Sequence, residues 1–145
     1  MTCTFFGHSD CYELNSAIVF SAIENLIKTG VNTFYVGQQG NFDSMVFNCL
    51  IQLREKYRHI LFYSVLAYIP KSKDAFTPSA EHSVYPEELE TCPPRFAIDK
   101  RNRWMIGKSD FCLCYVNDTW GGAYKFATLA KKKGLTVINL GKLDL

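Results

Sequence analysis

Apolar residues follow two patterns along the chain, short continuous runs and longer stretches with helical spacing. Five runs predict strands at 2–6, 33–36, 60–66, 111–116 and 136–140. Four stretches, in which apolar residues recur every three or four positions, predict helices at 13–29, 43–57, 95–108 and 122–133. Because strands and helices alternate, we expect right-handed crossovers and a parallel sheet.

The order of elements predicts a single α/β domain over 1–145, a Rossmann-like doubly wound sheet of about five parallel strands with helices on both faces. The unbroken apolar run at 60–66 agrees with a strand that is buried on both sides. Ligands of such sheets bind beyond the carboxyl ends of the strands, near the switch point. The residues that follow each strand are therefore the candidate site.

The periodic pattern stops between Pro70 and Pro94, a segment that contains all five prolines. Long loops inside a domain are often lids or binding loops, so we expect a long loop excursion over about 70–94. In or beside it lie Tyr68, Phe76, His82 and Tyr85. Two interpretations stay open: some of these side chains close over a ligand or form a subunit contact, or the excursion is a passive surface loop.

The formal net charge of the 145-residue chain is only +2. A dedicated nucleic-acid binder usually shows a basic stripe or a much larger charge, so we do not expect a nucleic-acid partner. No apolar run reaches the ~20 residues that cross a bilayer, and the N-terminus lacks a signal-peptide pattern, which predicts a cytoplasmic protein with no membrane partner. The six cysteines include no CxxC pair, so we expect no metal. We also expect no cofactor.

The first predicted strand is followed by Gly7, His8 and Ser9. Gly7 would let the backbone approach a ligand. Ser9 either donates to a phosphate or caps the next helix, and His8 is either a phosphate donor or an ordinary turn residue. All three are candidate ligand-binding residues.

The second predicted strand is followed by a glycine loop with Gly37, Gln38 and Gly40. A glycine loop that leads into a helix exposes backbone N–H groups at the positive end of the helix, which attracts an anion. Asp43 follows this loop. It is interpreted either as the helix cap or as a side chain that bonds a ribose hydroxyl or a base.

The fourth predicted strand is followed by Thr119, Trp120, Gly121 and Gly122, a second junction of strand, glycines and helix. The glycines offer backbone N–H groups and Thr119 adds a hydroxyl. Trp120 either stacks on a base at the rim or packs over the end of the sheet. Arg101, in the third predicted helix, would neutralise a phosphate with its forked donors if it reaches the same crevice.

Several of these residues, taken in order, resemble the SLOG superfamily, which unites the DNA-processing protein DprA (Smf), the LOG proteins and the small YpsA-like proteins. The resemblance rests on 101–105, Ser109, Asp110, Gly121 and Gly122, together with the loop 37–40 followed by Phe42 and Met45. It extends over nearly the whole chain and is strongest to the YpsA-like bacterial proteins. It implies a Rossmann-like fold, a nucleotide or nucleotide-derived ligand, and a homo-oligomer.

The chain departs from the LOG pattern at its catalytic positions. LOG enzymes cleave the N-glycosidic bond of nucleoside monophosphates with an Arg and a Glu. Here Asn102 stands where that pattern has Lys, and no Asp or Glu occurs between Gly122 and Gly134. Glycosidic cleavage needs a carboxylate, and Asp43 and Asp118 are the candidate catalytic replacements.

Three functions follow as hypotheses. The first is a sensor or sequestering protein that binds a nucleotide, including cyclic or ADP-ribose-type signalling nucleotides, without catalysis. The second is a LOG-like nucleotide N-glycosidic hydrolase with a relocated carboxylate. The third is a DprA-like single-stranded DNA binder, against which the low net charge argues.

Overall fold

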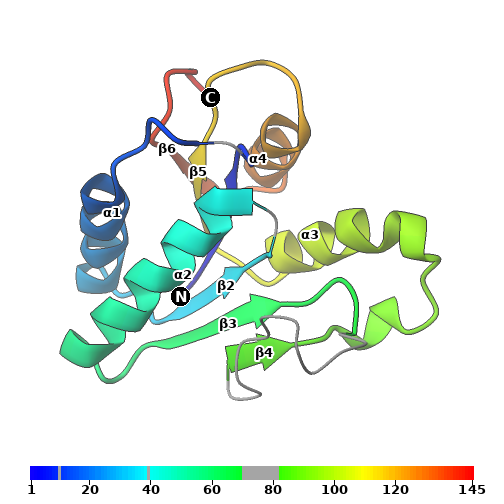
Figure 1. Ribbon diagram of the computed structural model, residues 1–145, viewed down its shortest axis with the longest axis horizontal. Coiled ribbons are helices and arrows are strands. Elements are labelled where there is room, and N and C mark those ends of the chain that lie inside the picture. Colours follow the sequence, from blue (N-terminus) through cyan, green and yellow to red (C-terminus); the bar gives the residue numbers. More distant parts are fainter. Residues whose placement is uncertain (10, 39, 70–81) are drawn as a thin grey trace.

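The computed structural model describes residues 1–9, 11–38, 40–69 and 82–145 (Figure 1). The strands are β1 (Thr2–Gly7), β2 (Thr33–Val36), β3 (Leu61–Val65), β4 (Ser83–Val84), β5 (Phe111–Tyr115) and β6 (Thr136–Asn139). The α-helices are α1 (Ser16–Lys28), α2 (Gly40–Lys56), α3 (Ala97–Gly107) and α4 (Gly122–Lys132). Two short 3-10 helices, Glu87–Leu89 and Pro94–Phe96, precede α3.

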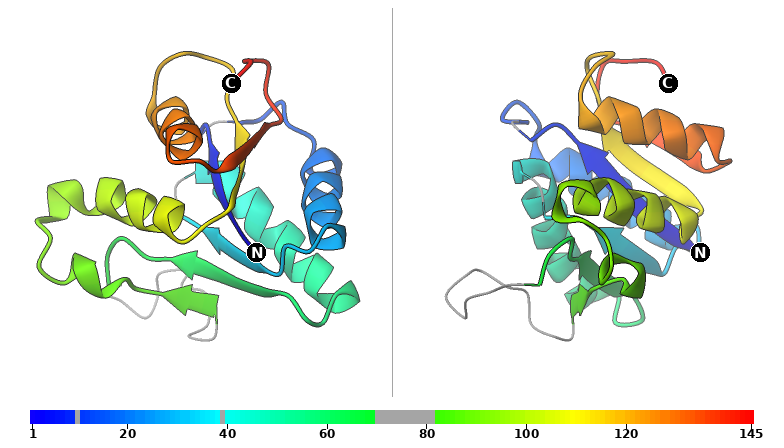
Figure 2. Two further views of the ribbon diagram at one scale, coloured as in Figure 1. Left: turned by 180° about the vertical axis from the view of Figure 1, so that it is seen from behind. Right: turned by 90° about the vertical axis from the view of Figure 1, so that its right-hand side faces the viewer.

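The strands form one parallel sheet in the order β4-β3-β2-β1-β5-β6. Helices α1 and α2 pack together on one face, and α3 and α4 lie on the other (Figures 1 and 2). Neighbouring residues of one strand point to opposite faces. Phe5 accordingly packs in the core beneath α1 and α2, whereas Phe6 packs against Phe126 of α4.

This architecture confirms the prediction of a Rossmann-like α/β fold with helices on both faces, but the sheet has six strands instead of about five. The additional strand is β4, which pairs with Ser64 and Val65 of β3 at the sheet edge. It lies within the segment expected to be a loop excursion. Two residues are too few for an alternating pattern, so hydrophobic periodicity could not predict this strand.

The part of the expected excursion from His82 onward packs on the domain. The His82 ring stacks on Phe62, with 4.3 Å between ring centroids, and Leu89 is only 3% exposed. Tyr68 donates a hydrogen bond from its hydroxyl to the Pro94 carbonyl at 2.9 Å, and Tyr85 packs beside Leu89. Phe76 and the rest of 70–81 lie outside the described residues.

Helices α1 and α2 begin at other residues than the sequence pattern predicts. Helix α1 begins at Ser16, three residues later than predicted, because Asn15 is its N-cap and accepts a hydrogen bond from the Ala17 N–H at 2.8 Å. Ser9 therefore does not cap this helix. Helix α2 begins at Gly40, three residues earlier than predicted, so Asp43 lies inside its first turn.

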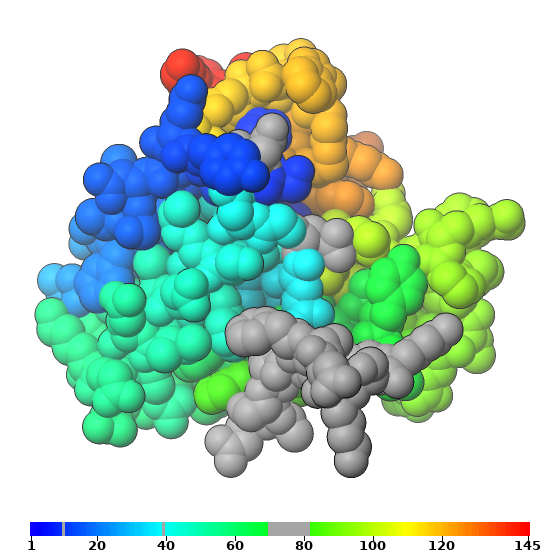
Figure 3. Space-filling view, in the orientation of Figure 1, coloured from blue at the N-terminus to red at the C-terminus, as the bar shows by residue number. Residues whose placement is uncertain are grey.

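The switch point of the sheet lies between β1 and β5. From β1 the chain proceeds to β2 and β3 on one side, and it later returns to place β5 on the other side of β1. In the space-filling view the N-terminal part of α2 (cyan), α3 (yellow-green) and α4 (orange) approach one another around this edge (Figure 3). Such an edge is where ligands of open α/β sheets bind.

Candidate functional site

A cleft of about 350 Å³ opens at the switch point, between the ends of β1 and β2 and the helices α3 and α4. Its volume lies at the lower end of the ~300–1,000 Å³ of small-molecule sites. The sequence-predicted residues that line it are Gly7, His8, Ser9, Gly37, Asp43, Arg101, Trp120, Gly121 and Gly122. The structure therefore brings together residues from three of the predicted post-strand segments and one predicted helix.

The cleft floor is apolar and was not predicted from the sequence. Phe6 of β1, Met105 of α3 and Phe126 of α4 form it, and Ile98 and Ala123 complete the wall. These residues look like ordinary core positions in the sequence, because each belongs to the buried face of its element. Asn102 was also missed as a lining residue, although it follows Arg101 directly.

The N-terminus of α4 opens into this cleft. Gly121 precedes the helix with φ of +90°, a conformation that favours glycine, and it provides no side-chain cap. The first N–H groups of an α-helix have no partner within the helix, and the helix dipole places partial positive charge there. Gly121, Gly122 and Ala123 all line the cleft, so this end of α4 is suited to an anion.

Arg101 is buried at the side of the cleft and is only 1% exposed. Its Nε donates to Asn102 Oδ1 at 2.8 Å and its Nη1 donates to the Val65 carbonyl at 3.0 Å. Burial lowers the pKa of the Arg101 guanidinium, and the nearby Asp43 carboxylate acts in the opposite direction. The guanidinium is thus held in one place by the protein itself.

Gly37 separates Arg101 from Asp43. A Cβ atom at this position would lie 3.1 Å from Arg101 Cζ and 3.1 Å from Asp43 Oδ2. A side chain at this position would therefore crowd both groups, and the glycine leaves room for them. Asp43 is itself buried, with 8% exposure, and lines the cleft from the first turn of α2.

His8 joins the ends of β1 and β5. Its Nε2 accepts a hydrogen bond from the Asn117 N–H at 3.0 Å, and its backbone N–H donates to the Tyr115 carbonyl at 3.3 Å. Because Nε2 accepts, the neutral ring carries its proton on Nδ1. Nδ1 is therefore the ring nitrogen of His8 that can donate to a ligand.

The other glycines near the cleft serve packing. A Cβ at Gly7 would collide with the Phe42 ring, so the space beside Gly7 is filled by protein. Gly40 has φ of +84° and packs on the backbone of Ser9. The Asn41 N–H donates to the Ser9 carbonyl at 3.1 Å, so the segments after β1 and β2 are fixed to one another.

Four predicted site residues do not line the cleft. Gln38 and Gly40 line a second recess of about 550 Å³ on the α2 side of the sheet edge. Asp118 and Thr119 are exposed and line neither hollow. Of the two candidate carboxylates, only Asp43 lies at the switch point.

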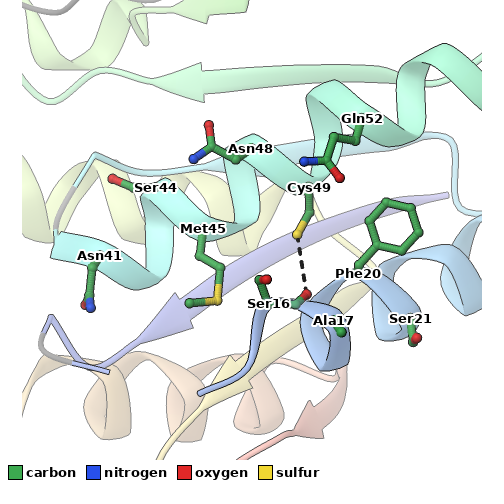
Figure 4. Close-up of a pocket in the computed structure, with 10 residues that line it drawn as sticks. All are labelled: Ser16, Ala17, Phe20, Ser21, Asn41, Ser44, Met45, Asn48, Cys49 and Gln52. Carbon is green, nitrogen blue, oxygen red and sulfur yellow. Dashed lines mark hydrogen bonds between the residues drawn. The ribbon is translucent and has the colours of Figure 1, made fainter. Parts of the chain in front are cut away.

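A larger groove of about 730 Å³ runs between α1 and α2, on the outer side of these helices (Figure 4). Met45 and Cys49 of α2 point toward α1, and Cys49 Sγ donates to the Ser16 carbonyl at 3.7 Å. The lining residues are Ser16, Ala17, Phe20, Ser21, Asn41, Ser44, Met45, Asn48, Cys49 and Gln52. They include no Asp, Glu, Lys or Arg.

Within the described part of the chain, no helix is both long and apolar enough to cross a membrane. No protein-family model matches the chain, and no curated protein matches its sequence.

Proposed function

We propose that this protein binds a nucleotide or nucleotide-derived ligand in the switch-point cleft and acts as a sensor or sequestering protein without catalysis. The observation that carries the proposal is the uncapped N-terminus of α4, whose glycines open into the cleft. A phosphate group placed there would accept hydrogen bonds from free backbone N–H groups and neutralise the positive end of the helix dipole.

The rest of the cleft supplies contacts for a base or ribose. Trp120 stands at the rim with 70% of its surface exposed, which leaves its ring free to stack on a base. The floor formed by Phe6, Met105 and Phe126 is apolar. Arg101 adds positive potential from a fixed position, because the hydrogen bonds to Asn102 and Val65 hold its side chain in place.

A second candidate function is hydrolysis of the N-glycosidic bond of a nucleotide. One observation favours it, namely that the buried Asp43 carboxylate lines the cleft beside Arg101. A carboxylate in this place can stabilise an oxocarbenium-like transition state or activate water. Asp118 is not part of this candidate mechanism because it does not line the cleft.

The test is native mass spectrometry and titration calorimetry with a panel of nucleotides, applied to the wild type and to two variants of Gly122. Nothing lies within 4 Å of a Cβ at this position, so both Gly122→Ala and Gly122→Asp fit. We expect Gly122→Ala to keep its ligand. Gly122→Asp should bind at least about fivefold more weakly, since like charges ~4 Å apart repel by ~1–4 kcal/mol.

Two results would contradict the binding proposal: no nucleotide binds to the wild type, or Gly122→Asp binds as tightly as Gly122→Ala. The same spectra distinguish the second function. An unchanged nucleotide supports a sensor or sequestering role, whereas release of base and ribose phosphate that disappears in Asp43→Asn supports a hydrolase.

We also propose that the protein forms a homo-oligomer through the groove between α1 and α2, and that it works in the cytoplasm. The groove lining carries no ionic charge, so two copies can meet there without like-charge repulsion. The six cysteines are free thiols, as in proteins of a reducing compartment.

A further inference from the structure

The second recess adjoins the nucleotide cleft at the end of β2. The two hollows share Gly37 and Asp43, and the recess has about 550 Å³ against about 350 Å³ for the cleft. The cleft lies toward α3 and α4, whereas the recess lies along α2. A ligand that fills both must pass the end of β2, where Gly37 and Asp43 line both hollows.

The recess has the chemistry of a site for uncharged polar groups. Gln38 and Asn48 contribute amides, Ser64 contributes a hydroxyl and Phe47 contributes an aromatic ring. No Lys, Arg or His occurs among the described residues that line it, and Asp43 is the ionisable group present. A second phosphate would meet no cation there, while the hydroxyl groups of a sugar would find both donors and acceptors.

Ser64 gives this recess a buried hydroxyl. The residue is only 2% exposed and lies on β3, on the same face as Phe62, which packs under α2. Its Oγ makes no hydrogen bond to another described residue, yet no fully buried polar side-chain atom in this part of the chain lacks a partner. The hydroxyl therefore opens into the recess. A buried hydroxyl without a partner is destabilising, so water or a ligand group is expected to pair with it there.

We infer that the cleft and the recess form one bipartite site, and that its ligand is a nucleoside diphosphate bearing a second, uncharged sugar. This inference rests on the proposed nucleotide-binding function. The phosphates lie at the N-terminus of α4 and the base reaches Trp120. The second sugar passes the end of β2 and binds Asn48 and Ser64 in the recess.

The test uses calorimetry on the full chain with two matched pairs of ligands, ADP with ADP-ribose and UDP with UDP-glucose. Members of a pair differ in the second sugar, whose attachment also removes one negative charge from the β-phosphate. We expect that sugar to tighten binding at least about tenfold in one pair. If the diphosphate binds and the added sugar brings no gain in either pair, the bipartite site is overturned while nucleotide binding stands. If no member of either pair binds, the bipartite site is overturned. The proposed binding of other nucleotides is then still decided by the nucleotide panel described above.

Three variants test whether the affinity gained from the second sugar arises in the recess. Ser64→Ala and Asn48→Ala should remove it, so that the sugar-bearing ligand binds no more tightly than its matched diphosphate. Gln52→Ala is the control, because Gln52 lies one helical turn after Asn48 on α2 and lines the outer groove instead of the recess. A gain that survives both Ser64→Ala and Asn48→Ala, or that is lost equally in Gln52→Ala, overturns the assignment of the second sugar to the recess.

Discussion

At the scale of single residues, Arg101 is the side chain that organises the cleft. Among the residues that the structure describes, it is the largest side chain that is almost fully buried, and its hydrogen bonds reach Val65 of β3 and Asn102 of its own helix. A buried charge is stable only when it is paired and hydrogen-bonded. The guanidinium meets this condition through its fork of donors and through the proximity of Asp43.

The geometry of this fork predicts that Arg101→Lys destabilises the protein although the charge is kept. A lysine cannot donate to Asn102 and to Val65 in the same arrangement, so the free energy of unfolding should fall by about 1–3 kcal/mol. Urea denaturation measures the change. Arg103→Lys is the matched control on the same helix. Arg103 is half exposed and pairs with Asp99, so its substitution should cost about 0.5 kcal/mol or less. Equal losses in the two variants would contradict the structural role of Arg101.

Glycines near the cleft show how one residue type serves different purposes. The sequence interpretation gave Gly7 the role of admitting a ligand, but the space beside it is filled by the ring of Phe42. Gly37 instead makes room for Arg101 and Asp43. The absence of a Cβ is visible in the sequence, whereas the neighbour that requires it is set by the packing of α2 on the sheet.

At the scale of elements, one carboxylate connects the two helices that form the cleft walls. Asp99 of α3 accepts from Arg103 Nε at 2.6 Å and from Lys125 Nζ of α4 at 2.8 Å. Hydrogen bonds from Lys125 and from Arg103 hold the pKa of Asp99 below its ordinary value of 3.8. The ionised carboxylate therefore favours the packed arrangement of α3 and α4.

This contact predicts a dependence of stability on pH. Because the pKa of Asp99 is lower in the folded protein, its contribution is present at neutral pH and is lost as the pH falls through and below 3.8. Asp99→Asn should therefore reduce the free energy of unfolding at neutral pH, and the difference from wild type should shrink in acid. Urea denaturation of both proteins from neutral pH to below pH 3.8 measures this difference in the free energy of unfolding.

The control for this experiment is Asp118→Asn. Asp118 is exposed and forms no ion pair with a described residue, so its substitution should leave the pH profile of stability unchanged. If the difference in the free energy of unfolding between Asp99→Asn and wild type stays constant from neutral to acid pH, the carboxylate is not a stabilising partner of Lys125.

At the scale of the whole molecule, the groove between α1 and α2 distinguishes one face from the rest of the surface. Its lining residues carry no ionic charge although 21% of the chain is charged. Close to it Ile18 is 52% exposed and Ile51 is 46% exposed. Charged side chains are depleted in the centre of protein interfaces, which agrees with the proposed contact between two copies of the chain.

If two copies meet through this groove, a single carboxylate placed on it should prevent formation of the homo-oligomer. Ala17→Glu places a carboxylate on the groove, and in a two-fold contact the same charge meets its copy or a desolvated surface. The helix itself should tolerate Glu, because an acidic residue in the first turn suits the helix dipole. Light scattering after size-exclusion chromatography should show an oligomer for the wild type and a monomer for Ala17→Glu.

Asn25→Glu provides the comparison, since Asn25 is an exposed residue of α1 that does not line the groove. It should assemble as the wild type does. A monomeric wild type, or an Ala17→Glu variant that assembles like Asn25→Glu, would refute self-association through this face.

The sequence alone determined most elements of the fold, because helix and strand periods are local properties. The five strands and four helices that it predicted are all present, and all of their ends agree within three residues. Strand β4 was the exception. It has two residues, and it exists because Ser83 and Val84 meet Ser64 and Val65 at the open edge of β3.

Tertiary structure decided which of the candidate residues form one site. The sequence placed Arg101, Asp43 and the glycine junctions in an order along the chain, and the parallel sheet predicted that post-strand segments would share an edge. The burial of Arg101 depends on the Val65 carbonyl 36 positions away, and the recess depends on Ser64 facing α2. Such contacts arise from the packing of helices on the sheet, so no local pattern contains them. Periodicity therefore established the elements, whereas packing selected Asp43 for the cleft and left Asp118 exposed.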